Sequence, residues 1–523
     1  MTAPSVAIVG SGIVGTTIAY LLTRRGHTVE IFEKGAPYEY PPARAFENQV
    51  FHLHEEPAWP QAAGDVHGLT QSGSYSADVN LERAIVEGGS ASIWEALTLR
   101  LMPRDFQTRS ACGYGVDWPL TYEELEPYYC RAEALLGVSG TDADNPSAPP
   151  RSQSHPLPPF ELAYDDRVLA DRLRPNGVVL HTTPQARTRH SYDGRPACVN
   201  LGSCTRCPIG ARYSPHHHLA RVVESGYGTL RTGVSVRRLV RHRDGRVGAL
   251  VYQENGALRE EEQSARIFVI AGGAVESARL LLLSADTRMR DGLGHGGGHV
   301  GQHLMFHHTW YGSLEYDSAL YPGRIGGWTA QCQQFCDPPT RGRHGGLKVE
   351  FTSQPWLFRL QLPERPLESG QAALDLLRPQ VYTRLVGLMG ESAPAPTKYV
   401  TLSEQRDRFG DPFAHVHYDA TDFDHETYRF GREVFDRLAV GTGAIQRTLA
   451  DAADYASGHH HLGTCRMGTN GADSVTDRYC LVHGVPNLYV VGGANFASAS
   501  SVNPTLTMVA LAIRAADTLA ERL

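Results

Sequence analysis

The feature that most constrains the fold lies within the first 33 residues of the chain. A four-residue apolar run leads into three glycines, Gly10, Gly12 and Gly15, spaced as Gly-x-Gly-x-x-Gly. A helical pattern follows, and a second apolar run ends directly before the acid Glu33. A strand, a glycine turn, a helix, a strand and an acid in this order are typical of a dinucleotide-binding βαβ unit.

Each glycine in this unit has its own reason to be there. Gly10 allows a tight turn, Gly12 lets backbone N–H groups approach a pyrophosphate, and Gly15 lets the helix pack on the strand. The helix N-terminus supplies positive partial charge for the phosphates, and Glu33 can accept hydrogen bonds from both ribose hydroxyls. A bare glycine motif is weak evidence, but the ordered set favours a bound dinucleotide. The acid favours an unphosphorylated ribose, so FAD or NAD is expected rather than NADP.

Bulk composition narrows the class of protein. The chain has 523 residues, which suggests two or more domains. A net charge of −7 argues against nucleic acid and anionic membrane as partners. No apolar run reaches transmembrane length, and the first strand starts too early to leave room for a signal peptide. We therefore expect a cytoplasmic protein, in which nine cysteines are more often thiols or ligands than disulfides.

Two further segments carry glycine turns. Gly88, Gly89 and Ser90 precede Trp94, so the backbone can lie flat against a planar ligand beside an aromatic wall. A simple turn beside a core tryptophan explains this segment equally well. Residues 229–270 alternate like strands, and residues 267–273 repeat the pattern of a strand followed by a glycine turn.

Three cysteines lie close together in the middle of the chain. Cys198, Cys204 and Cys207 are separated by five and by two residues, and a proline follows the last. The spacing is compatible with an iron–sulfur cluster, or with zinc if a histidine of residues 216–218 supplies a fourth ligand. A disulfide or free thiols remain open alternatives.

The last 65 residues again contain dense motifs. Three consecutive histidines centred on His460 precede a Gly-Thr pair, and an apolar strand leads to Gly493. Asn503 and Pro504 then begin a helix that runs to about residue 519. Residues 309–450 show longer loops and strands, and this is where a substrate domain is expected.

Taken together, these motifs resemble the glucose–methanol–choline (GMC) oxidoreductases from end to end. Within that family the chain is most similar to the branch of bacterial FAD-dependent glucose dehydrogenases, with pyranose and glycoside oxidases as neighbours. The resemblance implies an α/β (α+β) fold, in which a Rossmann-like FAD-binding domain joins a substrate-binding domain built on an antiparallel sheet. We assign residues 1–115, 190–308 and 455–523 to the FAD domain, and residues 116–189 and 309–454 to the substrate domain.

The resemblance also implies the catalytic groups. His460 falls on the position of the catalytic base and Asn503 on that of its partner, which holds the reacting oxygen while hydride moves to the flavin. A neutral imidazole near its normal pKa can accept a hydroxyl proton at pH 7. Asn503 is also expected to contact FAD, together with Gly10, Gly12, Gly15, Glu33, Gly88, Gly89, Ser90, Val236, Ala271, Gly493, Ala494, Pro504 and Thr505.

The sequence departs at two places from the family that it resembles. Some relatives attach flavin through a histidine beside the tryptophan of the double-glycine loop, but this chain has Ile93 there. Non-covalent FAD is therefore expected. The glucose dehydrogenase branch binds a three-iron cluster through three cysteines, and here the gap from Cys204 to Cys207 is one residue shorter. Because all three thiols are present, an iron–sulfur cluster is still expected.

The sequence thus predicts an enzyme that oxidises a hydroxyl of a sugar, glycoside or related polyol. The electron acceptor is left open among oxygen, a quinone and an electron-transfer protein. An antibiotic-pathway oxidase acting on an aminosugar or cyclitol is an alternative. A cyanohydrin-type lyase with an idle flavin is a third hypothesis, and bleaching of the flavin by substrate without air would separate it from the oxidases.

Overall fold

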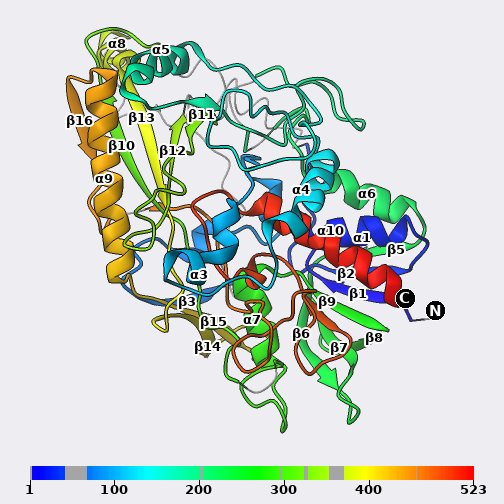
Figure 1. Ribbon diagram of the computed structural model, residues 1–523. Coiled ribbons are helices and arrows are strands. Elements are labelled where there is room, and N and C mark those ends of the chain that lie inside the picture. Colours follow the sequence, from blue (N-terminus) through cyan, green and yellow to red (C-terminus); the bar gives the residue numbers. More distant parts are fainter. Residues whose placement is uncertain are drawn as a thin grey trace.

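The computed structural model describes residues 3–41, 67–200, 204–205, 207–294, 297–322, 328–352, 370–454 and 456–523. The polar, proline-bearing stretch after Glu33 is expected from the sequence to form loops over a nucleotide, and part of it lies outside these ranges. Figure 1 shows two main bodies of strand, with the chain termini at one side of the molecule. Within the described ranges, no helix combines the length and the apolar character needed to cross a bilayer.

The first body is a parallel five-stranded sheet. Its strands follow the order β18-β9-β1-β2-β5, and β1 pairs in parallel with both β2 and β9. Apart from the edge strand β5, these strands are short and largely apolar, because helices cover one face of the sheet and a small antiparallel sheet covers the other. Their bounds are β1 (Val6–Val9), β2 (Val29–Phe32), β5 (Gly228–Arg231), β9 (Ile267–Ile270) and β18 (Leu488–Val490).

Helices from both ends of the chain pack around this sheet. The glycine turn after β1 opens α1 (Ile13–Thr23), whose residues are nearly all buried. The C-terminal helix α10 (Thr505–Arg522) packs against both α1 and α4 (Tyr122–Leu136). Helix α4 begins with a capping box, in which the Thr121 N–H donates to Glu124 Oε2 and the Glu124 N–H donates to the Thr121 hydroxyl. The other helices near the sheet are α6 (His216–Glu224) and α7 (Gly273–Leu283).

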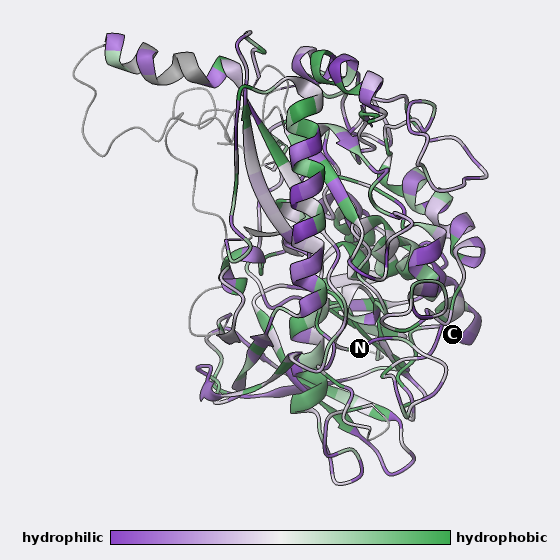
Figure 2. Cartoon of the chain, turned by 60° about the vertical axis from the view of Figure 1, so that its left-hand side comes forward, coloured by the Kyte–Doolittle hydropathy of each residue, from purple (hydrophilic) through white to green (hydrophobic). Residues whose placement is uncertain are grey.

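The second body is an antiparallel seven-stranded sheet. Its main order is β16-β10-β13-β12-β11-β4, and β17 pairs with β10. Helix α9 (Asp422–Thr442) covers one face, where Phe435 would collide with any side chain at position 312 on β10. Figure 2 brings this helix forward and shows hydrophilic residues along its outer side. The strands are β4 (His181–Thr182), β10 (His308–Glu315), β11 (Trp328–Cys332), β12 (Leu347–Thr352), β13 (Thr383–Gly390), β16 (Gln446–Leu449) and β17 (Ala456–Ser457).

Two small sheets and three further helices complete the described chain. One sheet orders its strands β14-β15-β3, and the other is the antiparallel β6-β7-β8. The strands are β3 (Leu69–Gly73), β6 (Val234–Arg241), β7 (Val247–Glu254), β8 (Glu261–Ser264), β14 (Lys398–Arg406) and β15 (Pro412–Tyr418). The helices are α3 (Thr108–Cys112), α5 (Tyr164–Leu173) and α8 (Gly370–Leu377). The predicted fold class, a Rossmann-like unit joined to an antiparallel sheet, is therefore confirmed.

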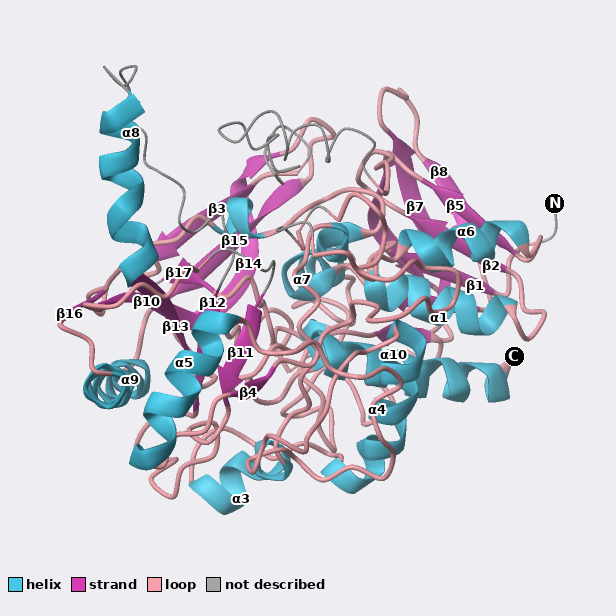
Figure 3. Cartoon of the chain, turned by 90° about the horizontal axis from the view of Figure 1, so that it is seen from above, coloured by secondary structure: helices cyan, strands magenta, loops and turns pink. Residues whose placement is uncertain are grey.

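Seen from above, the two main sheets lie on opposite sides of the molecule, with α7 and α10 between them (Figure 3). There are two hydrophobic cores. One joins a face of the parallel sheet to α1 and α10, and the other runs from the opposite face of that sheet through β6 and β7 to β10, β12 and β13. The division into two discontinuous domains stays a prediction. Because β3 pairs with β15, one strand of the assigned FAD domain lies in a sheet with strands of the other.

Candidate active site

A single cavity of about 470 Å³ runs between the two main sheets. At one end it is lined by the glycine turn after β1 and by Glu33. At the other end it is lined by His460 and Asn503, and by residues of the seven-stranded sheet that include Tyr311 and Glu350. The cavity therefore connects the expected nucleotide end of the site to the expected catalytic pair.

The glycines form a cradle at the first end. Gly10 has a φ of +102°, and a Cβ there would lie 2.6 Å from the carbonyl oxygen of Ala271. A Cβ on Gly15 would lie 2.0 Å from the carbonyl oxygen of Gly10, so only glycine lets α1 approach the turn. A Cβ on Gly12 would meet no atom within 4 Å and would stand in the cavity. Gly12 therefore keeps open the space that a pyrophosphate needs.

Glu33 is buried at the end of β2 and is held by its own chain. The Ser11 backbone N–H and hydroxyl both donate to Glu33 Oε2, at 2.8 and 2.7 Å, and the Gly35 N–H donates to Oε1 at 2.7 Å. Burial raises the pKa of this carboxyl, and these hydrogen bonds oppose the shift. With three donors already in place, Oε1 has more acceptor capacity left for a ribose than Oε2.

Two helix N-termini open onto the cavity. Helix α1 begins after Gly12 and α10 after Pro504, and no side chain caps either one. Gly12, Ile13, Asn503 and Thr505 all line the cavity. The free N–H groups and the helix dipoles supply positive partial charge at both ends of the cavity.

His460 is a half-buried imidazole that lines the second end of the cavity. Burial lowers its pKa well below the usual value, and the neighbouring His307, Lys348, His459 and His461 act in the same direction. The ring is therefore neutral at pH 7 and can accept a proton. Its Nδ1 atom lies 2.9 Å from Nδ1 of His307, whose Nε2 lies 3.1 Å from the carbonyl oxygen of Ala499.

Asn503 is fixed by a buried lysine. Lys348 Nζ donates to Asn503 Oδ1 and forms an ion pair with Glu350. Lys348 and Glu350 are two residues apart on β12, so both side chains leave the same face of the sheet. With its oxygen engaged by Lys348, Asn503 has its amide N–H groups left to donate.

The residues that flank His460 are held differently. His461 Nε2 lies 2.8 Å from Glu82 Oε2. His459 has a φ of +57°, which a residue other than glycine rarely adopts, and burial lowers its pKa. All three histidines line the cavity, but it is His460 that contacts His307.

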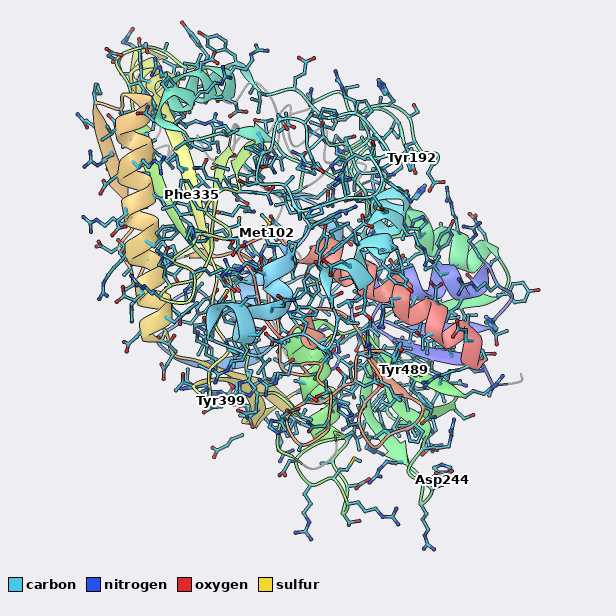
Figure 4. The ribbon with its side chains drawn as sticks, viewed as in Figure 1. Met102, Tyr192, Asp244, Phe335, Tyr399 and Tyr489 are labelled. Carbon is cyan, nitrogen blue, oxygen red and sulfur yellow. The ribbon has the colours of Figure 1, made fainter. Side chains whose placement is uncertain are left out.

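A buried ionic network supports the loop before Asn503. The Arg341 guanidinium pairs with Asp105 at 2.5 Å and with Glu391 at 2.8 Å, and all three side chains are fully buried. Asp105 Oδ2 accepts from the Ser500 hydroxyl at 2.7 Å, and its backbone carbonyl accepts from Ser498 at 2.7 Å. The backbone N–H of Met102 donates to Asp105 Oδ2 at 2.6 Å, and Figure 4 labels Met102 in the middle of the molecule.

Most of the expected site residues line this cavity. The structure brings together Gly10, Gly12, Glu33, Gly89, Ser90, Val236, Ala271, His460, Gly493, Asn503 and Thr505. The other four expected contacts, Gly15, Gly88, Ala494 and Pro504, lie directly beside lining residues in the chain. A Cβ on Gly89 would lie 3.1 Å from Gly12 Cα, so the double-glycine loop packs on the first glycine turn.

None of the three cysteines lines the cavity, although Thr205, the residue after Cys204, does. Cys204 and Cys207 are buried and Cys198 is half-buried. Cys204 Sγ accepts from Arg187 at 3.5 Å, and Cys207 Sγ accepts from the Arg212 N–H at 3.5 Å. Within the described ranges, the three thiols are not among the groups whose metal-ligand atoms all lie within 4.8 Å of one another.

The histidines considered for a zinc site have contacts other than the cysteines. His217 Nε2 lies 2.9 Å from Asp193, and His218 Nδ1 lies 2.8 Å from the Tyr213 hydroxyl. His216 Nδ1 lies 2.8 Å from the Ser214 hydroxyl. Among the described residues, the potential metal ligands of His217 and His218 lie within 4.8 Å of Asp193 rather than of the thiols. A zinc site shared by these histidines and the cysteines is therefore not favoured.

Comparisons with known proteins agree with this site. Residues 177–309 and 394–512 match two family models, both described as GMC oxidoreductase, and residues 8–37 match an NAD(P)-binding Rossmann-like domain. Paromamine 6'-oxidase of Streptomyces fradiae is 30% identical over 98% of this chain and 91% of its own. The chain is a GMC oxidoreductase.

Two further likenesses extend over whole chains. The fructose dehydrogenase large subunit of Gluconobacter japonicus is 27% identical over 98% of this chain and 97% of its own. The crystal structure of pyridoxine 4-oxidase from Mesorbium loti superposes with a TM-score of 0.66 at 17% identity, covering 98% of this chain and 99% of that one. The expected family and the expected class of enzyme, a flavin-dependent oxidoreductase, are confirmed.

The GMC fold binds FAD, and the cradle in this chain fits that cofactor. A Cβ on Gly273, as on Gly12, would meet no atom within 4 Å, and both glycines line the cavity. Space is thus kept open at the two glycine turns where a dinucleotide would lie. Glu33 follows at the distance along the chain where this motif places its ribose acceptor.

Sequence reasoning missed two residues of the GMC site, His307 and Lys348. Neither belongs to a motif, because His307 directly precedes β10 and Lys348 lies within the buried strand β12. Lys348 did leave a signal, since the chain has only three lysines and this one interrupts an apolar run. A lysine in a buried strand needs a partner.

Replacing Glu33 with alanine should weaken FAD binding. The change removes a charge-assisted hydrogen bond of about 1.5–3 kcal/mol, which corresponds to an affinity roughly 10- to 150-fold lower. Reconstitution of the apoprotein with FAD measures this effect. Glu30→Ala is a matched control, because Glu30 lies on β2, which ends just before Glu33, but pairs with Arg231 at 2.6 Å. Equal affinities of the Glu33 and Glu30 variants would show that Glu33 does not hold the ribose.

Proposed function

We propose that this enzyme oxidises a hydroxyl group of a sugar, glycoside or related polyol, with His460 as the base. The observation that carries the proposal is the continuous cavity, which leads from the glycine cradle to His460 and Asn503. When bound, FAD supplies the acceptor for the hydride that leaves the substrate carbon. The names of the relatives support this substrate class, since they include a fructose dehydrogenase and a paromamine oxidase.

In this mechanism side chains of the protein accept the hydroxyl proton and stabilise the negative charge on the substrate oxygen. Neutral His460 accepts the hydroxyl proton. The Asn503 amide, whose oxygen is engaged by Lys348, donates to the same substrate oxygen as negative charge develops there. The N-terminus of α10 begins beside Asn503 and adds positive partial charge at this end of the cavity.

The far end of the cavity suits a substrate rich in hydroxyl groups. Tyr311 and Trp328 offer aromatic surfaces, and Glu350 offers carboxylate oxygens that can accept hydrogen bonds. They come from β10, β11 and β12 and therefore lie on a rigid sheet rather than on loops. Such a surface can select one orientation of a sugar ring.

Anaerobic bleaching of the flavin tests the proposal. The holoenzyme is mixed without air with a panel of sugars, glycosides and polyols, and absorbance of the oxidised flavin is recorded. Loss of that absorbance with at least one member supports oxidation of a hydroxyl. Turnover of a cyanohydrin without bleaching would instead support the lyase hypothesis, and the absence of both reactions would contradict the proposed substrate class.

An aminosugar or cyclitol oxidase is a second candidate. The likeness to paromamine 6'-oxidase over almost the whole chain favours it, and Glu350 offers a carboxylate to a substrate amine. Paired substrates, such as glucosamine and glucose, separate the two functions in the same assay. Faster bleaching by the amine at pH 7 supports the second candidate.

The flavin is proposed to be bound without a covalent bond. Ile93 lies in the cavity wall and has no ring nitrogen that could attach to a flavin methyl group. Acid precipitation should therefore release yellow flavin into the supernatant, where its absorbance measures the yield. Flavin that stays with the denatured pellet would contradict this prediction.

We also propose that Cys198, Cys204 and Cys207 hold an iron–sulfur cluster. The Arg187 guanidinium beside Cys204 would offset part of the negative charge of bound thiolates, and a two-residue gap between cysteine ligands occurs in ferredoxins. A cluster would favour an electron-transfer protein as acceptor, whereas its lack would favour oxygen or a quinone.

The nine cysteines are all free thiols, which supports a cytoplasmic location.

Protein purified without air should accordingly contain iron and sulfide. Changing any one of the three cysteines to serine should abolish that content and slow electron transfer to an external acceptor, while substrate still reduces the flavin. Cys480→Ser is a control, because Cys480 is buried elsewhere. Protein reconstituted with iron and sulfide that nevertheless holds no iron would contradict the cluster and leave oxygen or a quinone as acceptor.

A further inference from the structure

The inference concerns His307, a buried histidine that contacts the proposed base but not the cavity. Its ring lies nearly perpendicular to the ring of His460, at 80°, with the two centroids 4.9 Å apart. The Nδ1 atoms of the two rings are 2.9 Å apart. His307 is absent from the cavity lining, so it can influence the substrate only through His460.

Strand pairing brings these two rings together. Residues 305–308 run antiparallel to residues 456–462, with Met305 opposite Leu462 and His308 opposite Ser457. The Gly458 N–H donates to the His307 carbonyl at 2.9 Å. A Cβ on Gly458 would lie 2.9 Å from His307 Cβ and 3.1 Å from His460 Nδ1. Glycine at this position therefore permits the contact between the two rings.

The hydrogen-bond chain leaves one arrangement of protons. The carbonyl oxygen of Ala499 can only accept, so His307 Nε2 must carry a proton. Burial lowers the pKa of His307 to about 4, and the ring is therefore neutral at pH 7, with an unprotonated Nδ1. A bare Nδ1 can only accept, so the proton shared with His460 belongs to His460 Nδ1.

We propose that His307 is a positioning residue that holds His460 in the tautomer protonated at Nδ1, leaving Nε2 as the bare nitrogen that accepts the substrate proton. In the reaction the substrate O–H bond breaks and an Nε2–H bond forms on His460. The resulting imidazolium keeps its Nδ1–H bond to His307. Within the described ranges, His460 Nε2 has no hydrogen-bond partner in the chain. This inference rests on the proposed role of His460.

The carbonyl at the start of this chain of hydrogen bonds is itself anchored. Ala499 lies between Ser498 and Ser500, and the hydroxyl of each serine donates to Asp105 at 2.7 Å. Ser500 adopts a φ of +59°, which tight support of the loop makes possible. The Asp105–Arg341–Glu391 network thus holds the group that orients His307.

Two amide variants separate the contacts of His307. His307→Asn keeps an oxygen close to the position of Nδ1, from which it can accept from His460. His307→Gln instead places its amide near the position of Nε2, where it can donate to Ala499. Both variants replace the imidazole ring with an amide side chain, so both lose the packing of the ring in the core. His308→Gln, at the next residue, is a further control, because His308 contacts the Tyr418 hydroxyl instead of His460.

Two measurements are made on each holoenzyme. Stopped-flow reduction by substrate without air gives the rate constant for flavin reduction. Spectra of ¹⁵N-histidine-labelled protein, with the His460 signal identified from its loss in His460→Gln, show which nitrogen of His460 carries the proton. FAD content and Tm verify that each variant is folded.

We expect the rate to follow the tautomer. His307→Asn should keep Nδ1–H on His460 and reduce flavin within a few-fold of the unmodified enzyme. His307→Gln should lose that signal and slow reduction about 10- to 100-fold, the range found for partners that orient imidazoles at metal sites. His308→Gln should keep both the signal and the rate.

The outcomes also separate this inference from the proposed function. If His460→Ala slows flavin reduction but His307→Gln does not, the role of His307 is overturned and the base remains. A slow His307→Gln enzyme that still carries the proton on Nδ1 would overturn it equally. If His460→Ala itself reduces flavin at the normal rate, the proposed function fails first.

Discussion

Replacing His460 with alanine should leave FAD bound and slow flavin reduction by substrate about 10² to 10⁴-fold. The imidazole is the proposed acceptor of the hydroxyl proton, and without it hydride transfer would have to proceed from a neutral alcohol. The cofactor cradle lies at the other end of the cavity, so FAD content should stay close to one per chain. Stopped-flow reduction without air measures the rate constant directly.

The pH dependence of the same reaction has a defined sign. The base must be neutral, and burial, together with the neighbouring Lys348 and histidines, holds the pKa of His460 well below its usual value. The rate constant should therefore stay at full value as the pH falls from 8 to 6.5, and decline only at more acidic pH. Two results would move the base to another residue, with His459 and His461 as the first candidates. One is a His460→Ala rate constant for flavin reduction within about threefold of that of the unmodified enzyme. The other is a decline of the rate constant that is already complete at pH 6.5.

Replacing Lys348 with methionine should lower both stability and rate. Lys348 is fully buried and is the partner of Glu350 and of Asn503 Oδ1. Its removal leaves a buried carboxylate without its cation, which costs about 3–5 kcal/mol in the free energy of unfolding. The Asn503 amide also becomes free to rotate, so the reacting oxygen loses a defined donor. Chemical unfolding of the holoenzyme measures the first effect and flavin reduction the second.

A double variant separates these two effects. Lys348→Met with Glu350→Gln removes the unpaired charge, so most of the lost stability should return. The rate should stay low, because Asn503 still lacks the partner that fixes its amide. If the rate recovers together with the stability, Lys348 has only a structural role, and the orientation of Asn503 must be set by other contacts.

Much of the fold was predictable because its information is local. The glycine turn after β1, the capping box of α4 and the alternation in β14 and β15 each depend on residues close together in the sequence. The lining residues Glu33, His460 and Asn503 were found because each belongs to an ordered motif. The electrostatics at the His460 end of the cavity were only partly predictable. His460 was expected to have a pKa near its normal value, but burial lowers that pKa.

The partners of the catalytic pair could not be predicted in the same way. His307 reaches His460 through pairing between segments 153 residues apart, and Lys348 reaches Asn503 across 155 residues. No local pattern records contacts over such separations. The Asp105–Arg341–Glu391 network depends in the same way on three distant segments. Sequence motifs therefore point to the groups that are proposed to act on a substrate, and the structure shows which groups contact them.

The cavity has a further consequence, for how the protein unfolds. Its walls belong to both main sheets, so a ligand that fills it contacts two hydrophobic cores at once. Binding energy is then shared between the two halves, and at a free concentration a thousand times Kd it adds about 4 kcal/mol to the stability of the native state. The two cores, one of which already contains residues of both main sheets, are thereby coupled more tightly. The cofactor that takes part in the chemistry would also serve as a bridge that makes both cores melt together.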